Sequence, residues 1–147
     1  MTKKLGIVLV VLTILTGCSG TMPKLGINNG QLMPCPKTPN CVNSQATADE
    51  KHFIQPIHFA GPHQEAKSAL LKILEAYKRT KIIVAEEEYI QAEFTSMVFR
   101  FVDDVEFYLP STEAEETMIH VRSASRIGYS DFGVNRKRIE RIRSELK

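Results

Sequence analysis

The chain has 147 residues, of which 43% are hydrophobic and 24% are charged, an average composition for one globular domain. This apolar content and balanced charge exclude wholesale disorder and low-complexity structure. The 19 Lys and Arg and the 17 Asp and Glu give a net charge of only +2, and the chain without Lys3 and Lys4 is neutral. Because nucleic-acid binding relies on a basic surface, we expect no nucleic-acid partner.

The N-terminal residues are typical of an export signal. Lys3 and Lys4 precede an apolar run over 5–15, which is too short to span about 30 Å of hydrocarbon as a stable helix. The run ends in Leu15-Thr16-Gly17-Cys18, which resembles the lipobox of bacterial lipoproteins. We therefore expect a lipoprotein signal peptide over 1–17 and a lipid on Cys18. The alternative is an ordinary signal peptide followed by a chance cysteine.

Lipidation of Cys18 would anchor the chain to a membrane without spanning it. The cysteine thiolate accepts the diacylglyceryl group, and two or more acyl chains hold a protein stably. Ser19 follows the cysteine, as in lipoproteins that are sorted to the outer membrane. Asp at this position favours retention in the inner membrane instead. We therefore expect a protein on the periplasmic face of the cell envelope, in the outer rather than the inner membrane.

The next segment is expected to be irregular. Residues 19–34 mix Gly, Asn, Pro, Ser and Thr, which predicts a flexible tether after the lipidated cysteine, over 18–34. Cys35 and Cys41 then bracket five residues, and a disulfide is the default for such a pair in an exported protein. Free thiols, a redox pair or a metal clip are the alternatives. The flank to about residue 50 is expected to be irregular, within one domain over 35–147.

Hydrophobic periodicity predicts the elements of this domain in the order strand, helix, four strands, helix. Residues 53–59 alternate apolar and polar around Pro56, which indicates an edge strand or a bend. An apolar stripe at i, i+3, i+4 and i+7 then predicts a helix over 62–78. Four strands are expected after it, over 81–87, 89–96, 98–109 and 118–125. We interpret the third as one long strand.

A final helix is expected after an irregular segment over 128–133, with Ser130 or Asp131 as its cap. Long antiparallel strands must bury one face, and the two helices are the cover available. The order therefore predicts an α+β fold in which a curved antiparallel sheet packs against helices and grips the C-terminal one. TATA-binding-protein repeats and helix-grip proteins share this order, an analogy that carries no function.

The densest polar group lies between residues 122 and 138, with two acids upstream. The candidate cluster is Asp103, Asp104, Arg122, Ser123, Ser125, Arg126, Asp131, Asn135 and Arg138. Arginines and hydroxyls at a helix N-terminus could bind a phosphate or a carboxylate. In the alternative, the arginines pair with the aspartates as a structural network. Ten acids and one base over 86–116, against eight bases and three acids over 117–147, allow such pairing.

Catalytic motifs are missing from the sequence: it contains no nucleophile elbow, P-loop, zinc-protease or dinucleotide-binding pattern. Asp103 and Asp104 would suit acid–base chemistry, but neighbouring strand residues face opposite sides of a sheet. A metal site built from His52, His58 and His120 is a weaker alternative to solvated or hydrogen-bonded histidines. We expect no metal and no cofactor, and the catalytic residues, if there are any, are unknown.

Three motifs in the chain resemble the domain-of-unknown-function family 1499. They are Pro34-Cys35-Pro36-x-x-Pro39-Asn40-Cys41-Val42-x-Ser44, Arg100-Phe101-x-Asp103-Asp104-Val105-Glu106-Phe107, and Val121-Arg122-Ser123-Ala124-Ser125-Arg126-x-Gly128-Tyr129-Ser130-Asp131-x-Gly133-Val134-Asn135-x-x-Arg138-Ile139. The resemblance covers about residues 32–146. It implies an envelope or secreted protein, commonly a bacterial lipoprotein, and it supports the disulfide while implying no activity.

The favoured function is a membrane-anchored, non-catalytic binding or accessory module of the cell envelope. Its partner would be an envelope protein or a small anionic ligand. The alternative is an envelope hydrolase or transferase that uses Asp103 or Asp104 with Arg122 and Asn135, and it requires these side chains to converge in a cleft. A purely structural envelope protein is the third hypothesis, and it predicts no pocket beside the Arg-rich turn.

Overall fold

The computed structural model describes residues 20–112 and 114–146, so the expected signal peptide and Cys18 lie outside the described residues. None of the helices in this part of the chain is long and apolar enough to cross a membrane. The elements in chain order are β1 (Ile27–Asn28), β2 (Gln31–Leu32), β3 (Cys41–Asn43), β4 (Ile57–Phe59), α1 (His63–Ala76), β5 (Thr80–Ala85), β6 (Tyr89–Thr95), β7 (Val102–Tyr108), β8 (Thr117–Ser125) and α2 (Val134–Glu145).

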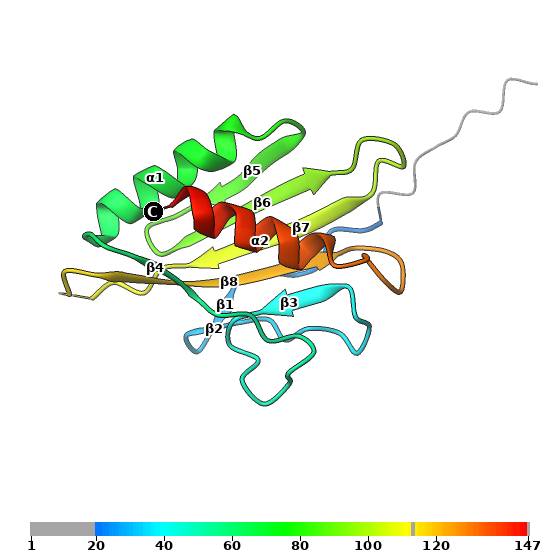
Figure 1. Cartoon of the computed structure of the whole chain (residues 1–147), viewed down its shortest axis with the longest axis horizontal. Helices are drawn as coiled ribbons and strands as arrows, with labels where there is room; N and C mark the ends of the chain where they lie inside the picture. The colour runs from blue at the N-terminus through cyan, green and yellow to red at the C-terminus, as the bar shows by residue number, and fades with distance from the viewer. Residues whose placement is uncertain (1–19, 113, 147) are drawn as a thin grey trace, which may run out of the picture.

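A six-stranded antiparallel sheet lies at the centre of the molecule (Figure 1). Its strand order is β3-β8-β7-β6-β5, and β4 also pairs with β8. β3 pairs with residues 122–124 of β8 and β4 with residues 117–119, so the two short strands extend one edge of the same long strand. The sheet is curved and does not close into a barrel, which confirms the expected α+β class.

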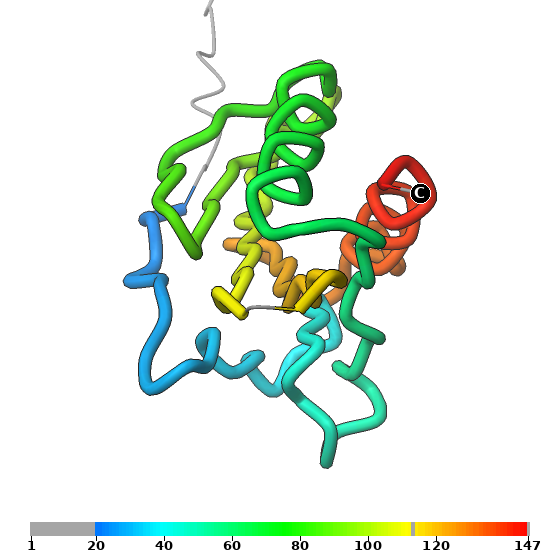
Figure 2. Tube along the Cα trace, turned by 90° about the vertical axis from the view of Figure 1, so that its left-hand side faces the viewer, coloured from blue at the N-terminus to red at the C-terminus, as the bar shows by residue number. Residues whose placement is uncertain are grey.

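Both helices cover the same face of the sheet, called here the helix face (Figure 2). The apolar stripe of α1 is buried there, as is that of α2. Aliphatic and aromatic side chains of β6, β7 and β8 meet these stripes in one core. Burial of such surface contributes about 25 cal/mol per Å². The fully buried residues of this core include Leu70, Leu74, Ile90, Val105, Phe107, Ile119, Val121, Ile139 and Ile142.

The β1–β2 hairpin lies on the opposite face, called here the hairpin face (Figure 2). The Gly26 amide donates to Glu106 Oε1 at 3.1 Å. The Gln45 side chain accepts from the Leu32 amide at 2.8 Å and donates to the Gly30 carbonyl at 3.0 Å. The described part of the tether expected over 18–34 therefore contains a hairpin, because its two strands pair and side chains of the domain bind three of its backbone groups.

Cys35 and Cys41 form the expected disulfide, with Cα atoms 5.7 Å apart. Cys41 begins β3, which pairs with β8 in the register Cys41↔Ala124. The expectation of an irregular segment to about residue 50 is therefore wrong at β3. Three residues carry too little periodicity to indicate a strand, and the pairing partner lies far away in the sequence.

The helices expected over 62–78 and near the C-terminus are confirmed, as are the four strands that follow α1. The third of these strands, expected as one long strand over 98–109, is wrong in its first residues, because β7 begins only at Val102. A turn precedes it, in which the Ser96 amide donates to the Phe101 carbonyl at 2.8 Å and Arg100 has a positive φ of 58°. The alternating apolar residues of this turn are exposed, so their pattern imitated a strand.

Candidate functional site

The polar cluster predicted from the sequence is divided between the two faces of the sheet. The register of β7 and β8 pairs Asp103 with Ser125 and Asp104 with Ala124. Since successive side chains on a strand point to opposite faces, Asp103 lies on the helix face and Asp104 on the hairpin face. The cluster therefore forms two separate networks.

Asn135 is the centre of the network on the helix face, where it is fully buried at the start of α2. Its Oδ1 accepts hydrogen bonds from Ser123 Oγ and from Arg138 Nη1, both at 2.5 Å. Its Nδ2 donates to Ser125 Oγ at 3.0 Å and to Asp131 Oδ2 at 2.9 Å. One amide side chain thus joins β8, α2 and the loop between them, and all of its hydrogen-bonding atoms are used.

The network contains three charged residues, an Arg138–Asp103 ion pair and Asp131, which accepts from amides. Arg138 Nη2 donates to Asp103 Oδ2 at 2.5 Å, and the guanidinium lies 4.7 Å from the centroid of the Phe94 ring. Asp131 Oδ1 accepts from the Gly133 amide at 3.0 Å and Oδ2 from the Asn135 amide at 2.8 Å. The N-cap position itself is occupied by Gly133, so the expected cap at Ser130 or Asp131 is wrong in position. Asp131 still satisfies an amide of the first turn from two residues before the N-cap, where a carboxylate complements the helix dipole.

Glu106 is the centre of the network on the hairpin face, where it is fully buried. Its Oε2 accepts from Arg122 Nη1 at 3.0 Å, and its Oε1 accepts from the Tyr89 hydroxyl at 2.8 Å. Burial and the Glu106 carboxylate raise the pKa of Tyr89, so the phenol stays protonated and remains a donor. Sequence reasoning missed this pair, although the even spacing from Asp104 to Glu106 places both on one face.

Arg126 is held by two carboxylates at the end of β8. Its Nε and Nη2 donate to both oxygens of Asp104, at 2.8 and 2.7 Å, and Nη2 also contacts Glu93. Asp104 and then Glu93 raise the pKa of Arg126. This pairing with Asp104 is one that the structural alternative predicts.

The arginines of the predicted cluster are thus each matched to at least one carboxylate, an arrangement that favours the structural network over an anion site. The residues of the hydrolase hypothesis do not converge. Asp103 and Asn135 lie on the helix face, whereas Asp104 and Arg122 lie on the hairpin face. Nothing in this geometry supports that hypothesis.

The histidines also have ordinary partners. His52 Nδ1 lies 2.6 Å from Asp49 Oδ2, which raises the pKa of His52. His58 Nδ1 lies 3.0 Å from Glu116 Oε1, and burial lowers the pKa of His120. Across residues 20–112 and 114–146, no group of three or more His, Cys, Asp or Glu side chains could hold a metal ion.

A pocket of about 320 Å³ lies beside the helix-face network, between the β6–β7 and β8–α2 loops. Phe99 and Phe101 line it from the first loop, and their rings are stacked with centroids 5.4 Å apart. Ile127 and Phe132 line it from the second, and Asp103 contributes a polar group. Sequence reasoning missed the pocket because residues 98–109 were assigned to a strand.

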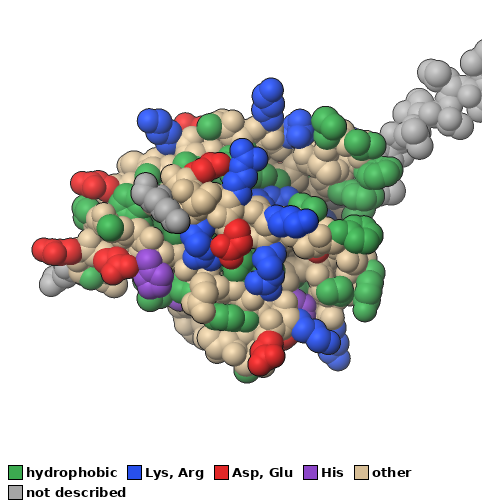
Figure 3. All heavy atoms as spheres, viewed as in Figure 1, with side chains coloured by type: hydrophobic (Ala, Val, Ile, Leu, Met, Phe, Trp, Pro, Cys, Tyr) green, Lys and Arg blue, Asp and Glu red, His purple; other side chains and the backbone are tan. Residues whose placement is uncertain are grey.

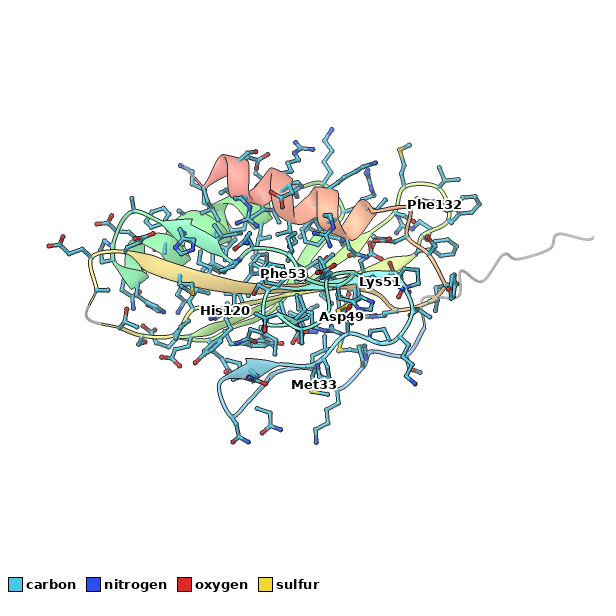
Figure 4. All side chains as sticks on the ribbon, turned by 60° about the horizontal axis from the view of Figure 1, so that its bottom comes forward. Met33, Asp49, Lys51, Phe53, His120 and Phe132 are labelled. Carbon is cyan, nitrogen blue, oxygen red and sulfur yellow. A yellow bond between two sulfur atoms is a disulfide. The ribbon has the colours of Figure 1, made fainter. Side chains whose placement is uncertain are left out.

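The same two loops expose a group of large apolar side chains at one end of the molecule. Figure 3 shows hydrophobic side chains gathered at this end, and Figure 4 shows Phe132 there. Most of the large hydrophobic side chains exposed in the described part of the chain belong to this group. We call it the apolar tip, and its members are Met97, Val98, Phe99, Phe101, Tyr129, Phe132 and Val134.

Comparison with known proteins gives one match. A model of the family described as "Protein of unknown function (DUF1499)" matches residues 31–146. This range contains both polar networks and both loops of the apolar tip. No curated protein and no solved structure matches the chain.

Proposed function

Because the chain belongs to the DUF1499 family of proteins of unknown function, we propose its role from its own residues. It is a membrane-anchored, non-catalytic binding or accessory module of the bacterial cell envelope, held on the periplasmic face by a lipid on Cys18. Ser19 favours the outer membrane over the inner one. Its partner is an envelope component bound by the surface that the paired charges leave free.

The pairing of charged side chains supports a role without catalysis. An acid–base or nucleophilic site needs side chains that converge on one reacting atom. Here the candidate carboxylates are hydrogen-bonded to arginines, on two faces of a sheet. What remains free beside these networks is the apolar tip and its pocket, between the β6–β7 and β8–α2 loops.

The motif Leu15-Thr16-Gly17-Cys18 is the observation that carries the proposed anchor, and the position of Gly20 limits how far the domain could lie from it. A Cβ built on Gly20 would lie 3.0 Å from Ile127 Cγ2 and 3.3 Å from Arg126 Cβ, so the chain already packs against the domain at this residue. Only Ser19 separates Gly20 from Cys18. A lipid on Cys18 would therefore hold the domain at the membrane surface, without the long tether that the composition predicts.

The test is the fate of Cys18→Ala in cells. We expect the unchanged chain to carry a diacylglyceryl mass on Cys18 and to sediment with outer membranes on a density gradient. Cys18→Ala should lose this mass and leave that fraction. The matched control is the double variant Cys35→Ser, Cys41→Ser, which removes two cysteines and should keep the lipid. Membrane retention of Cys18→Ala, or a parent chain without lipid, would refute the anchor.

A further inference from the structure

We propose that the apolar tip inserts into the lipid bilayer beside the acylated Cys18, so that lipid and tip together fix the orientation of the domain. This inference rests on the anchor of the proposed function and deepens it. The lipid supplies attachment. The tip is a second contact, made by protein side chains, which a single flexible anchor does not require.

The exposure of the tip is the first argument. Phe132 is 89% exposed, Val98 is 71% exposed and Phe99 is 69% exposed. Soluble monomers rarely expose contiguous apolar surface of this kind unless it binds something. Aromatic and aliphatic side chains at the tips of loops are suited to the boundary between headgroups and acyl chains.

The position of the tip indicates that the lipid bilayer is what it contacts. Gly20 lies against Ile127 in the same loop that carries Phe132, and the described chain begins at this end of the molecule (Figure 1). Two residues of chain reach at most about 7 Å, even fully extended. The acyl chains on Cys18 would therefore enter the bilayer next to the tip. This proximity favours the bilayer over a protein partner or a second copy of the chain.

Charge near the tip also fits a lipid surface. Arg100 lies within the β6–β7 loop and is exposed. Exposed Lys78, Arg79 and Lys137 line the neighbouring pocket, which shares Val134 with the tip. The acids at this end are engaged, as described for Glu93, Asp103 and Asp131. Free cations around an apolar centre attract anionic headgroups such as phosphatidylglycerol.

The sequence contains no tryptophan, so one introduced tryptophan reports on its own surroundings. Phe132→Trp places the reporter in the tip. Met118→Trp is the matched control, because Met118 is also exposed but lies near the other end of β8. Each full chain, isolated with its lipid, is reconstituted into vesicles of phosphatidylethanolamine and phosphatidylglycerol with brominated acyl chains. Bromine quenches tryptophan only where the two are in contact.

We expect the tryptophan at 132 to lose most of its emission and to shift to shorter wavelength, and the tryptophan at 118 to be unaffected. If the lipid is present on Cys18 and the protein floats with the vesicles while neither reporter is quenched, the anchor stands and the inserted tip is refuted. A blue shift at 132 without bromine quenching, accompanied by crosslinked dimers, would assign the tip to a second copy and also overturn the inference.

A chain that carries no lipid would reject the anchor separately. The same brominated vesicles are then added to the unacylated Phe132→Trp protein. Quenching at position 132 would keep the membrane-binding tip and reject only the proposed anchor. Absence of quenching would reject both.

Discussion

On the helix face of the central sheet, Phe107 and Val121 are fully buried among aliphatic side chains, whereas on the hairpin face Glu106 and Arg122 are buried beneath residues 26–32. Burial of apolar surface is favourable in itself. Burial of a charge costs free energy unless the charge is paired. The helix face should therefore supply stability, while the hairpin face should depend on the pairing of its buried charges. The first two predictions below test these two kinds of burial, and the others test smaller contributions on and around the hairpin face.

The largest effect is expected on the helix face. Phe107→Ala should lower the free energy of unfolding by about 3–5 kcal/mol, because the truncation leaves a cavity in a close-packed core. Urea denaturation followed by circular dichroism measures the loss. Val98→Ala in the exposed tip is the control and should change stability by less than about 0.5 kcal/mol. A loss below about 1 kcal/mol at Phe107 would mean that this face is not the core.

Removal of one charge from the hairpin face should lower the free energy of unfolding almost as much. A second substitution that removes the opposite charge should restore part of this loss. Arg122→Met should destabilise by roughly 3 kcal/mol, because the Glu106 carboxylate remains buried without its cation. Adding Glu106→Gln should regain at least about 1 kcal/mol, since a neutral amide oxygen still accepts from Tyr89. A double variant that is less stable than Arg122→Met would contradict the dependence on paired charge.

The disulfide is the next contribution in size. Cys35→Ser with Cys41→Ser should lower stability by about 2 kcal/mol, because the bond closes a short loop in the unfolded chain. Reduction of the disulfide in the unchanged protein should lower the melting temperature by as much as the double substitution does. If reduction has no effect on the unchanged protein, the bond is either not formed in solution or does not restrict the unfolded state.

Loosening of the hairpin itself should cost less. Gln45→Ala removes the side-chain partners of the Leu32 amide and the Gly30 carbonyl, so we expect about 1 kcal/mol. Hydrogen exchange should quicken at Leu32 and at Gly26 while the amides of β7 keep their protection. Exchange that quickens equally in β7 would show that the hairpin and the sheet unfold as one unit.

The smallest effect concerns pH and His120 on β8. Burial lowers the pKa of His120 below its ordinary value of 6.5, so the unfolded chain takes up the proton first as pH falls. Stability should therefore decline as pH falls below about 6.5 and level off below the folded pKa. His120→Gln should remove this part of the decline in melting temperature between pH 7 and 5. The pKa of His52 is raised, so its contribution is lost as pH rises above about 6.5. His120→Gln is therefore compared with the unchanged chain at each pH, since both contain His52.

The parts of the fold that could be predicted are those with local signals. The apolar stripes of α1 and α2 and the alternation in β6 and β8 depend on residues close in sequence. β1, β2 and β3 have two or three residues each, too few to show a periodicity, and the partner of β3 is the distant strand β8. The strand predicted over 98–109 failed because a sequence does not distinguish an apolar residue that is buried from one that is exposed.

The candidate site shows the same difference between local signals, which a sequence contains, and contacts between distant residues, which it does not. Charge patterning indicated that acids and bases pair, and Arg126 with Asp104 was among the pairs considered. The choice of Glu106 for Arg122 depends on the β7–β8 register, and strand spacing alone does not fix a register. The apolar tip depends on the meeting of two loops about 30 residues apart in the sequence, which no local pattern reports.

The contacts of Asn135 also bear on when the domain can fold, because they join the beginning of the domain to its end. Its amide reaches the Asn40 carbonyl at 3.2 Å, across 95 residues of sequence, and β3 pairs with the last strand of the sheet. Ile139 and Ile142 of α2 belong to the core that these contacts surround. The first strand of the sheet therefore has no partner until nearly the last residues of the chain are present, and contacts of such long range make folding slow.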